Sequence, residues 1–253
     1  MSVASLLALG ASAAVESANT FGVVKVESSQ KQTIIAGPWV QVGTAGNVNV
    51  ADLVMTSNLT ARDTTSPAAE GTGDMLYYYN GSTYDAWELT QEGSSAAKVW
   101  TAVQNVTANG ITSNSGAASL TALPRGKALI LVRANTEPPI YLYGQNATGT
   151  ATSTIEGAAN TTTWNLIAPS MAADAIISPT STETANVTMA GTPAAGDYII
   201  LNSYPTRKFT YVDDSWGYQP SGFNKPRVVG LTVPAGTGAW YVASGESNVT
   251  FTW

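Results

Sequence analysis

The feature that most constrains the fold is a series of landmarks that occurs twice, in the same order, along the 253 residues. The first series is Trp39, Ala51-Asp52, Gly73-Asp74, Trp100, Leu123-Pro124-Arg125-Gly126 and Ile140–Tyr143. The second is Trp164, Ala173-Asp174, Gly196-Asp197, Trp216, Val233-Pro234-Ala235-Gly236 and Thr250–Trp253. Two intervals match: Asp52 to Asp74 is 22 positions against 23 in the second series, and Pro124 lies as far from Tyr143 as Pro234 lies from Trp253. The intervals on either side of Trp100 are longer than those on either side of Trp216, which places the extra length in loops. The pattern predicts an internal duplication of one β-rich unit.

Short β-branched or aromatic runs, bounded by Gly, Pro, Asn or Ser, predict strands throughout the chain. They are Phe21–Glu27, Thr33–Ala36, Met75–Tyr79, Ala128–Arg133, Ile140–Tyr143, Tyr198–Asn202, Lys208–Val212, Arg227–Val233, Ala239–Ala243 and Asn248–Trp253. Helix is expected only in the N-terminal apolar run and in a short turn near Val50–Thr56, with a counterpart at Ala172–Ile177. The two Gly-Asp pairs fit turns that enter strands. The predicted fold is all-β, with two tandem antiparallel β-sandwich or jelly-roll-like domains.

The predicted organisation is an N-terminal segment at 1–19, a first domain at 20–145 and a second at 146–253. A linker rich in Thr and Gly covers Gly144–Asn160. The apolar run Val3–Ala14 ends in Ala11-Ser12-Ala13, as a signal peptide does, but Met1-Ser2 carries no positive charge. The run is too short to span a bilayer. It is interpreted as an export signal or as an apolar arm.

Composition excludes several classes of function. The net charge is −6 and the 11 Lys and Arg residues are scattered, so neither nucleic acid nor an anionic membrane surface is expected as a partner. Without Cys or His, thiolate nucleophiles, Cys- or His-based metal sites and Ser-His-Asp triads are excluded. No cofactor or metal is predicted. Charged residues make up 11% of the chain, against about 25% in typical soluble domains, so Thr, Ser, Asn and Gln must form the surface.

Two carboxylate pairs are the remaining candidates for catalysis. Asp85 and Glu88 flank Trp87 in a segment that could line a sugar cleft, and Asp213 is followed by Asp214. The alternative is a solvated loop or strand edge around one buried Trp. Because neither pair recurs at matching landmarks, the prediction is that the protein is not an enzyme.

Aromatic residues are the other candidates for a site, because flat apolar rings stack on sugars. Four Trp residues at or beside paired landmarks are interpreted as core anchors: Trp39, Trp100, Trp164 and Trp216. Tyr79, Tyr84 and Trp87 are left as candidate ligand contacts.

The order of Trp, Gly-Asp and Leu/Val-Pro-x-Gly before an apolar strand, over roughly residues 20–253, resembles tandem β-domains of bacterial secreted or cell-surface proteins. The resemblance implies an extracellular or cell-surface location and a non-enzymatic role. It assigns no functional residue.

The expected function is structural: a secreted protein that forms homo-oligomers or polymers in a surface layer, filament or matrix. Phe21, Val23, Val24 and Val26 belong to a strand that precedes the first copy and could add to a neighbour's sheet edge. The alternative is that this strand completes its own domain. Two other functions stay open, a carbohydrate-binding or adhesive module with glycans as partners and a virion structural protein.

Overall fold

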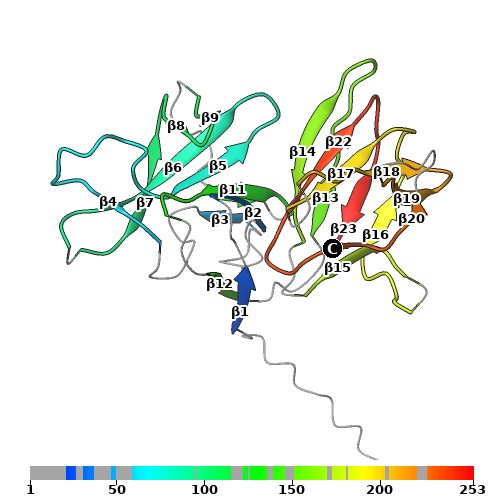
Figure 1. Ribbon diagram of the computed structural model, residues 1–253, viewed down its shortest axis with the longest axis horizontal. Coiled ribbons are helices and arrows are strands. Elements are labelled where there is room, and N and C mark those ends of the chain that lie inside the picture. The colour runs from blue at the N-terminus through cyan, green and yellow to red at the C-terminus, as the bar shows by residue number, and fades with distance from the viewer. Residues whose placement is uncertain are drawn as a thin grey trace, which may run out of the picture.

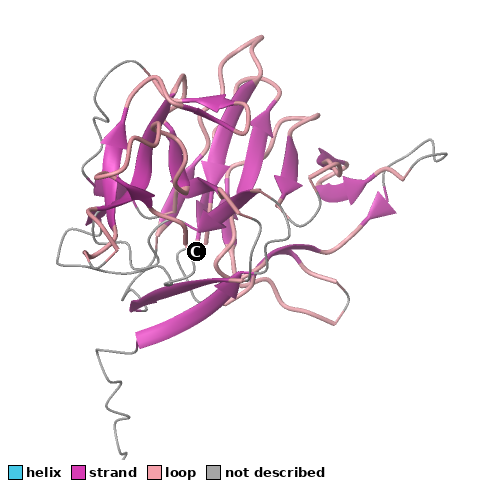
Figure 2. Cartoon of the chain, turned by 60° about the vertical axis from the view of Figure 1, so that its left-hand side comes forward, coloured by secondary structure: helices cyan, strands magenta, loops and turns pink. Residues whose placement is uncertain are grey.

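The computed structural model describes residues 21–26, 31–36, 47–49, 59–94, 96–114, 122–124, 126–135, 139–145, 151–169, 173–180, 182–202, 205–220 and 227–253. All regular secondary structure in these ranges is β-strand, so the fold is all-β, as the sequence predicts (Figure 2). The predicted N-terminal segment 1–19 and helical turn at Val50–Thr56 lie outside the described residues.

Strand ladders divide the described residues into two groups, which lie side by side in Figure 1. Unit 1 contains β1 (Phe21–Val26), β2 (Gln32–Ala36), β3 (Asn47–Asn49), β4 (Arg62–Asp63), β5 (Met75–Tyr79), β6 (Tyr84–Gln91), β7 (Val99–Val103), β8 (Thr107–Ala108), β9 (Ile111–Thr112), β10 (Ala122–Pro124), β11 (Ala128–Val132) and β12 (Ile140–Gln145). Unit 2 contains β13 (Thr152–Thr154), β14 (Thr163–Ile167), β15 (Ala175–Ser178), β16 (Thr188–Ala190), β17 (Tyr198–Leu201), β18 (Phe209–Val212), β19 (Ser215–Tyr218), β20 (Arg227–Val228), β21 (Leu231–Val233), β22 (Ala239–Ala243) and β23 (Thr250–Thr252).

The same pairing order occurs in both units. In unit 1 the main sheet runs β2-β11-β5-β6-β7, with β4 added parallel to β6. In unit 2 it runs β14-β22-β17-β18-β19, followed by β20. The smaller pairs β3–β10 and β1–β12 correspond to β15–β21 and β13–β23. This correspondence is a property of the fold. Its origin in a duplication, the domain boundaries and the tandem sandwich arrangement stay predictions.

Two of the sequence landmarks occupy the same place in both ladders. Asp74 and Asp197 directly precede β5 and β17, and both are fully buried. Their main-chain oxygens accept hydrogen bonds from Leu89 and Tyr211, each at 2.8 Å. Trp100 lies opposite Leu89, and Trp216 lies opposite Tyr211. Both tryptophans are buried, as expected of core anchors.

The tryptophan landmark at the start of each series does not follow the ladders. Trp39 lies outside the described residues, and Trp164 is part of β14, where it pairs with Val242. The corresponding residue of β2 is Gln32, which pairs with Val132. Trp164 is also 40% exposed, so its assignment as a core anchor was wrong. Trp164 was matched to Trp39 because both are tryptophans, whereas the strand register decides which residues of the two units correspond.

Local patterns predicted 11 of the 23 described strands and missed the others, among them strands with buried polar residues. Met75–Tyr79 and Ala239–Ala243 have the predicted bounds, but the long strand β6 was not predicted. This strand is buried, and it places the polar residues Asp85, Glu88 and Thr90 in the interior. Ala175–Ser178 is a strand that pairs with β21, where a helical turn was expected. The pairing partner, distant in sequence, overrides a weak local preference.

Each unit has its own core between its main sheet and a smaller sheet. In unit 1, Val26 and Ile140 of the β1–β12 pair pack with Leu76 and Leu129 of the main sheet. In unit 2, Phe251 of β23 packs with Tyr241 and Ile199. This layering is β-sandwich-like.

A third core lies on the opposite face of the unit 1 sheet. Met75, Tyr77 and Ile130 pack there with residues of unit 2, among them Leu166 and partly buried Trp240. Both faces of this sheet are therefore covered. That explains why Ala128–Val132 is apolar and buried at every position instead of alternating.

Contacts between the units are reciprocal. Ala36 donates its main-chain N–H to Gly236 O at 2.7 Å, and Ala168 donates to Gly126 O at 3.1 Å. These pairs occupy corresponding positions, so exchanging the units maps one contact onto the other, as in a twofold interface. At its centre, a Cβ on Gly238 would lie 2.5 Å from the Cβ of Ala128, and only glycine permits this approach.

Candidate functional site

The predicted assembly strand is β1, which pairs with β12 along its whole length, from Phe21 opposite Gln145 to Val26 opposite Ile140. Val24 and Val26 are buried in the unit 1 core. The side chains of Phe21 and Val23 lie outside what the structure describes. Within one chain β1 thus pairs with its own unit, in line with the alternative interpretation. Exchange between chains stays a prediction.

The β1–β12 ribbon, residues 21–26 with 140–145, differs from its counterpart at one edge. In unit 2, β23 lies between β13 and β16 and is paired on both sides. In unit 1, residues 65–67 have the chain position that matches β16, but they form no strand with β12. Among the described residues, β12 pairs with β1 alone, so no described strand covers its second edge.

Tyr79 and Tyr84 lie in a row of aromatic rings that crosses from unit 1 to unit 2. Ring centroids are separated by 5.1 Å between Tyr84 and Tyr79, and by 5.7 Å between Tyr79 and Trp240. The row continues from Trp240 to Trp164 at 5.5 Å, and then to Tyr198 at 6.5 Å. Neighbouring rings meet at steep angles, so the row fixes ring positions but is no continuous flat platform.

Trp87 was wrongly predicted as an exposed ligand contact. Its side chain is 5% exposed and packs in the unit 1 core with Leu89 and Leu131. Because β6 runs inside a sheet covered on both faces, alternation along the strand directs Trp87 into that core. The interpretation of one buried Trp was correct, but the surrounding segment is a buried strand and not a solvated loop.

The carboxylates of Asp85 and Glu88 do not form a catalytic pair. They are three positions apart on one strand, so they point to opposite faces of the sheet. Both are fully buried. Asp85 accepts a hydrogen bond from Asn114 Nδ2 at 2.6 Å. Two carboxylates separated by a sheet cannot act on the two sides of one glycosidic bond.

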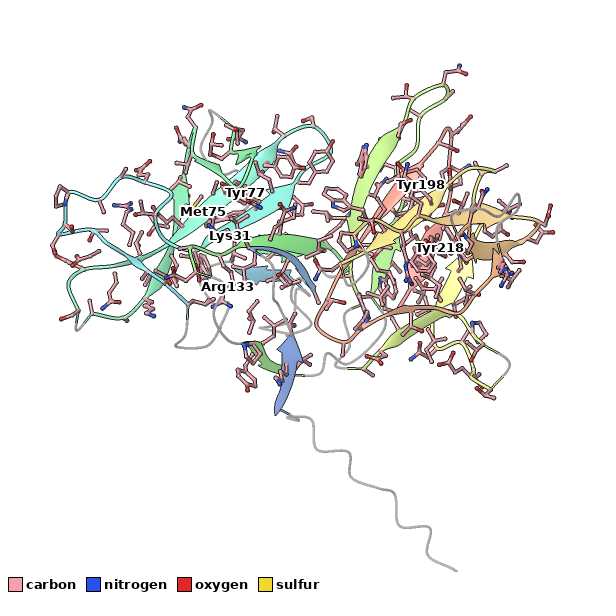
Figure 3. The ribbon with its side chains drawn as sticks, in the orientation of Figure 1. Lys31, Met75, Tyr77, Arg133, Tyr198 and Tyr218 are labelled. Carbon is pink, nitrogen blue, oxygen red and sulfur yellow. The ribbon has the colours of Figure 1, made fainter. Side chains whose placement is uncertain are left out.

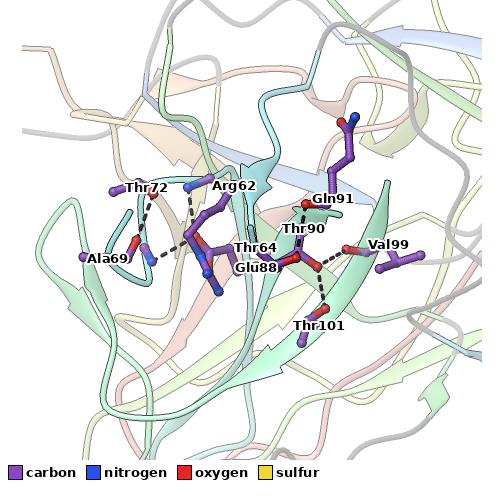
Figure 4. A network of polar contacts seen from close by, with 11 residues as sticks. Arg62, Thr64, Ala69, Thr72, Glu88, Thr90, Gln91, Val99 and Thr101 are labelled. Carbon is purple, nitrogen blue, oxygen red and sulfur yellow. Dashed lines mark hydrogen bonds and ion pairs between the residues drawn. The ribbon is translucent and has the colours of Figure 1, made fainter. Parts of the chain in front are cut away.

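Glu88 instead organises the loop before β5, as Figure 4 shows. Its Oε2 accepts a hydrogen bond from Arg62 Nε at 2.8 Å, and its Oε1 accepts from the main-chain N–H groups of Gly71 and Gly73 at 2.9 Å each. A Cβ on Gly73 would lie 2.6 Å from Leu89 O, which explains this glycine. The role is structural.

Replacing Glu88 by Gln is expected to lower the free energy of unfolding by about 3 kcal/mol. The amide nitrogen would face either two glycine N–H donors or the Arg62 guanidinium, and none of these accepts a hydrogen bond. Urea unfolding measures the change. Glu92, which is exposed, supplies the control Glu92→Gln, for which less than about 0.5 kcal/mol is expected. Equal stability of the two variants would contradict this role.

Asp213 and Asp214 form the two-residue turn between β18 and β19. Their φ angles are 52° and 59°, as a type I′ hairpin requires at both central positions. Asp tolerates this conformation better than most residues do. The pair therefore has a sufficient structural explanation.

Asp74 and Asp197 are acceptors for main-chain donors. Asp74 accepts from Thr60 N at 3.0 Å and from Ala134 N at 2.7 Å. Burial raises the pKa of Asp74, opposed by these two bonds and by Arg133 and Lys98. Asp197 accepts from Ala194 N, Tyr241 OH, and both N and Oγ of Ser244. Both carboxylates fix the entry to a strand, as predicted for the Gly-Asp pairs.

The fold and these contacts define an all-β, β-sandwich-like protein with a two-stranded β1–β12 ribbon and a row of aromatic rings between its units. Comparison with protein-family models, curated proteins and solved structures finds no match. The described residues contain no cluster of three or more His, Cys, Asp or Glu side chains suited to a metal. Within the same residues no helix has the length and hydropathy to cross a membrane.

Proposed function

We propose that this protein is a non-enzymatic extracellular structural protein whose copies assemble through the β1–β12 ribbon into a surface layer, filament or matrix. The observation that carries the proposal is the second edge of β12, where the described residues include no counterpart of the strand that β16 supplies to β23. An open edge accepts another strand through main-chain hydrogen bonds.

A second copy of the chain is the occupant that fits best. The ribbon has an outer edge on β1 and another on β12, and each strand is six residues long. Addition of the β12 edge of one copy to the β1 edge of the next is a head-to-tail contact, which generates a filament when the rotation between copies does not close a ring. The low content of charged residues leaves few of the edge charges that normally oppose such addition.

Two further features support a structural role. The carboxylates that could have acted in catalysis are bound to structural partners inside unit 1 or form a hairpin turn. The surface relies on Thr, Ser and Asn rather than on charge, a composition common in secreted and assembled β proteins.

A single substitution on β12 tests the assembly. Tyr141 lies opposite Lys25, so Tyr141→Glu places opposite charges across the ribbon and preserves it, while charging the edge strand. Light scattering is expected to show large particles for the wild-type chain and a monomer near 26.2 kDa for the variant.

The control is Gln104→Glu. Gln104 is exposed, directly follows β7 and lies outside the ribbon, so this variant should assemble like the wild type. A wild-type chain that stays monomeric at all concentrations, or a Tyr141→Glu variant that assembles normally, would refute the proposal. Deletion of residues 1–30 is a poorer test because it removes Val24 and Val26 from the core.

A further inference from the structure

A cleft of about 580 Å³ lies at the boundary of the two units. Gln32 and Ile34 of β2 form its unit 1 wall, and Ile200, Asn202 and Trp240 contribute from unit 2. The volume lies within the range of about 300–1,000 Å³ typical of small-molecule sites. The cleft is separate from the β1–β12 ribbon, so its occupant is independent of the proposed assembly.

Trp240 gives the cleft a positioned aromatic surface. Its ring meets Trp164 at an interplanar angle of 87° and Tyr79 at 69°, both edge contacts that hold the ring in place. Trp240 is itself only partly buried and lines the cleft. A fixed, partly exposed indole beside an apolar residue such as Ile200 offers contact to the C–H face of a sugar ring.

Three side-chain amides surround this apolar surface, and hydrogen bonds fix their orientation. Asn202 Oδ1 accepts from Ile34 N at 2.9 Å, which leaves its Nδ2 as a donor. Asn109 Nδ2 donates to Gln32 Oε1 at 3.2 Å, which leaves Asn109 Oδ1 and Gln32 Nε2. Asn109 is held over the cleft by the β8–β9 turn, where Asn109 and Gly110 have φ of 48° and 81°.

The chemistry of the lining selects among ligands. Among the described residues that line the cleft there is one cation, Lys31, and no carboxylate. Side-chain amides both donate and accept hydrogen bonds, as the hydroxyl groups of a ligand do. A single lysine supplies too little positive charge to bind a polyphosphate. A molecule with apolar ring faces and many hydroxyls satisfies both parts of the lining, and a sugar is such a molecule.

A second depression, of about 450 Å³, extends the cleft along unit 1. Lys31 and Asn109 line both depressions, and Thr72 and Thr107 contribute further polar groups. Arg133 also lines the second depression, but it is buried and its Nε lies 4.0 Å from the Asp74 carboxylate, which balances its charge. Lys31 and Arg133, both labelled in Figure 3, are neighbours, because Arg133 donates its main-chain N–H to Lys31 O at 2.7 Å. Two adjoining depressions fit a chain of several sugar rings better than one ring.

On the opposite side of the boundary between the units, the corresponding cleft is nearly filled by side chains. There the corresponding hollow measures only about 120 Å³ and is lined by Tyr79 and Trp164. In strand register Trp164 corresponds to Gln32, and Tyr79 corresponds to Asn202. Smaller amide side chains in place of two aromatic ones open the larger cleft and supply its polar groups.

We propose that this cleft is a carbohydrate-binding site that takes a segment of a polysaccharide, with Trp240 beneath a sugar ring and Gln32, Asn109 and Asn202 on its hydroxyls. The site differs from the one predicted from sequence, because it excludes Trp87 and Tyr84 and uses Tyr79 only to support Trp240.

Affinity electrophoresis of the full chain in gels that contain soluble β-glucan, α-glucan, xylan or alginate tests the proposal. At least one polysaccharide is expected to retard the wild type. Gln32→Ala should weaken retardation about tenfold or more, the loss expected when a buried polar contact to the ligand is removed. Gln32→Trp, which copies the closed side, should abolish retardation.

Gln104→Ala, at an exposed glutamine outside the cleft, is the matched control and should behave like the wild type. Gln32 is itself only half-buried at the start of β2, and the thermal melts of its variants verify folding. No retardation by any polysaccharide, or equal retardation of folded Gln32→Trp and wild type, would overturn the proposal. The Tyr141→Glu monomer should bind normally, so failure of assembly and failure of this site are distinguishable.

Discussion

Replacing Asp197 by Asn is expected to destabilise the protein by about 4 kcal/mol, the largest effect of any single substitution considered. The Asp197 carboxylate is fully buried, and each oxygen accepts from a main-chain N–H, Oδ1 from Ser244 and Oδ2 from Ala194. Tyr241 OH donates to Oδ2 at 2.6 Å. In either orientation the amide nitrogen of Asn would face a main-chain donor, and a main-chain N–H cannot reverse its role.

Urea unfolding of the purified variants measures this loss. Asp213→Asn is the control, because Asp213 is exposed and Asn adopts its positive φ readily. That substitution should change the free energy of unfolding by less than about 0.5 kcal/mol. A loss below about 1 kcal/mol for Asp197→Asn would contradict the assignment.

Alkali is expected to unfold the protein as the pH rises from about 10 to 12. Burial raises the pKa of Tyr77 from 10.0 to about 12. Burial, followed by its bond to Asp197, raises the pKa of Tyr241 further. A tyrosine whose folded pKa lies above its unfolded value contributes stability that is complete below the unfolded pKa and lost as the pH passes through the folded one. For Tyr77 alone this amounts to about 3 kcal/mol, at about 1.4 kcal/mol for each pH unit.

Urea midpoints recorded between about pH 9 and pH 11.5 test this dependence. The midpoint should be constant below about pH 9.5 and fall steadily above it. Tyr77→Phe keeps the ring in the core and removes the titrating group, so its midpoint should fall less steeply. Stability that does not change across this range would show that Tyr77 and Tyr241 ionise in the folded protein as readily as in the unfolded chain.

The strands that sequence reasoning found are those whose burial follows a simple rule. Met75–Tyr79 and Ala239–Ala243 are bulky, β-branched or aromatic, and bounded by turn residues, so local pattern sufficed. Strand β6 was missed because it carries Asp85, Glu88 and Thr90 into the interior. Such residues are normally exposed, and only partners distant in sequence, such as Arg62 for Glu88, make their burial favourable.

The candidate site was predictable only in part. Flat rings pointed to Tyr79 and Tyr84, and both belong to the aromatic row at the unit boundary. Trp240 was noted among the aromatic residues but not chosen, and Gln32, Asn109 and Asn202 carry no sequence signal of their own. They come from four different strands or turns of the two units, and only the packing of those units brings them to one cleft.

The sequence by itself determined the strand-forming pattern, the Gly-Asp turns that enter strands and the absence of histidine and cysteine chemistry, because these depend on residue type and on short-range spacing. Tertiary structure alone decided register, exposure and the cleft. Register made Gln32 and not Trp39 the counterpart of Trp164, and burial on both sheet faces placed Trp87 inside. The physical reason is that a side chain's surroundings are set by partner strands far away in sequence, which no local pattern specifies.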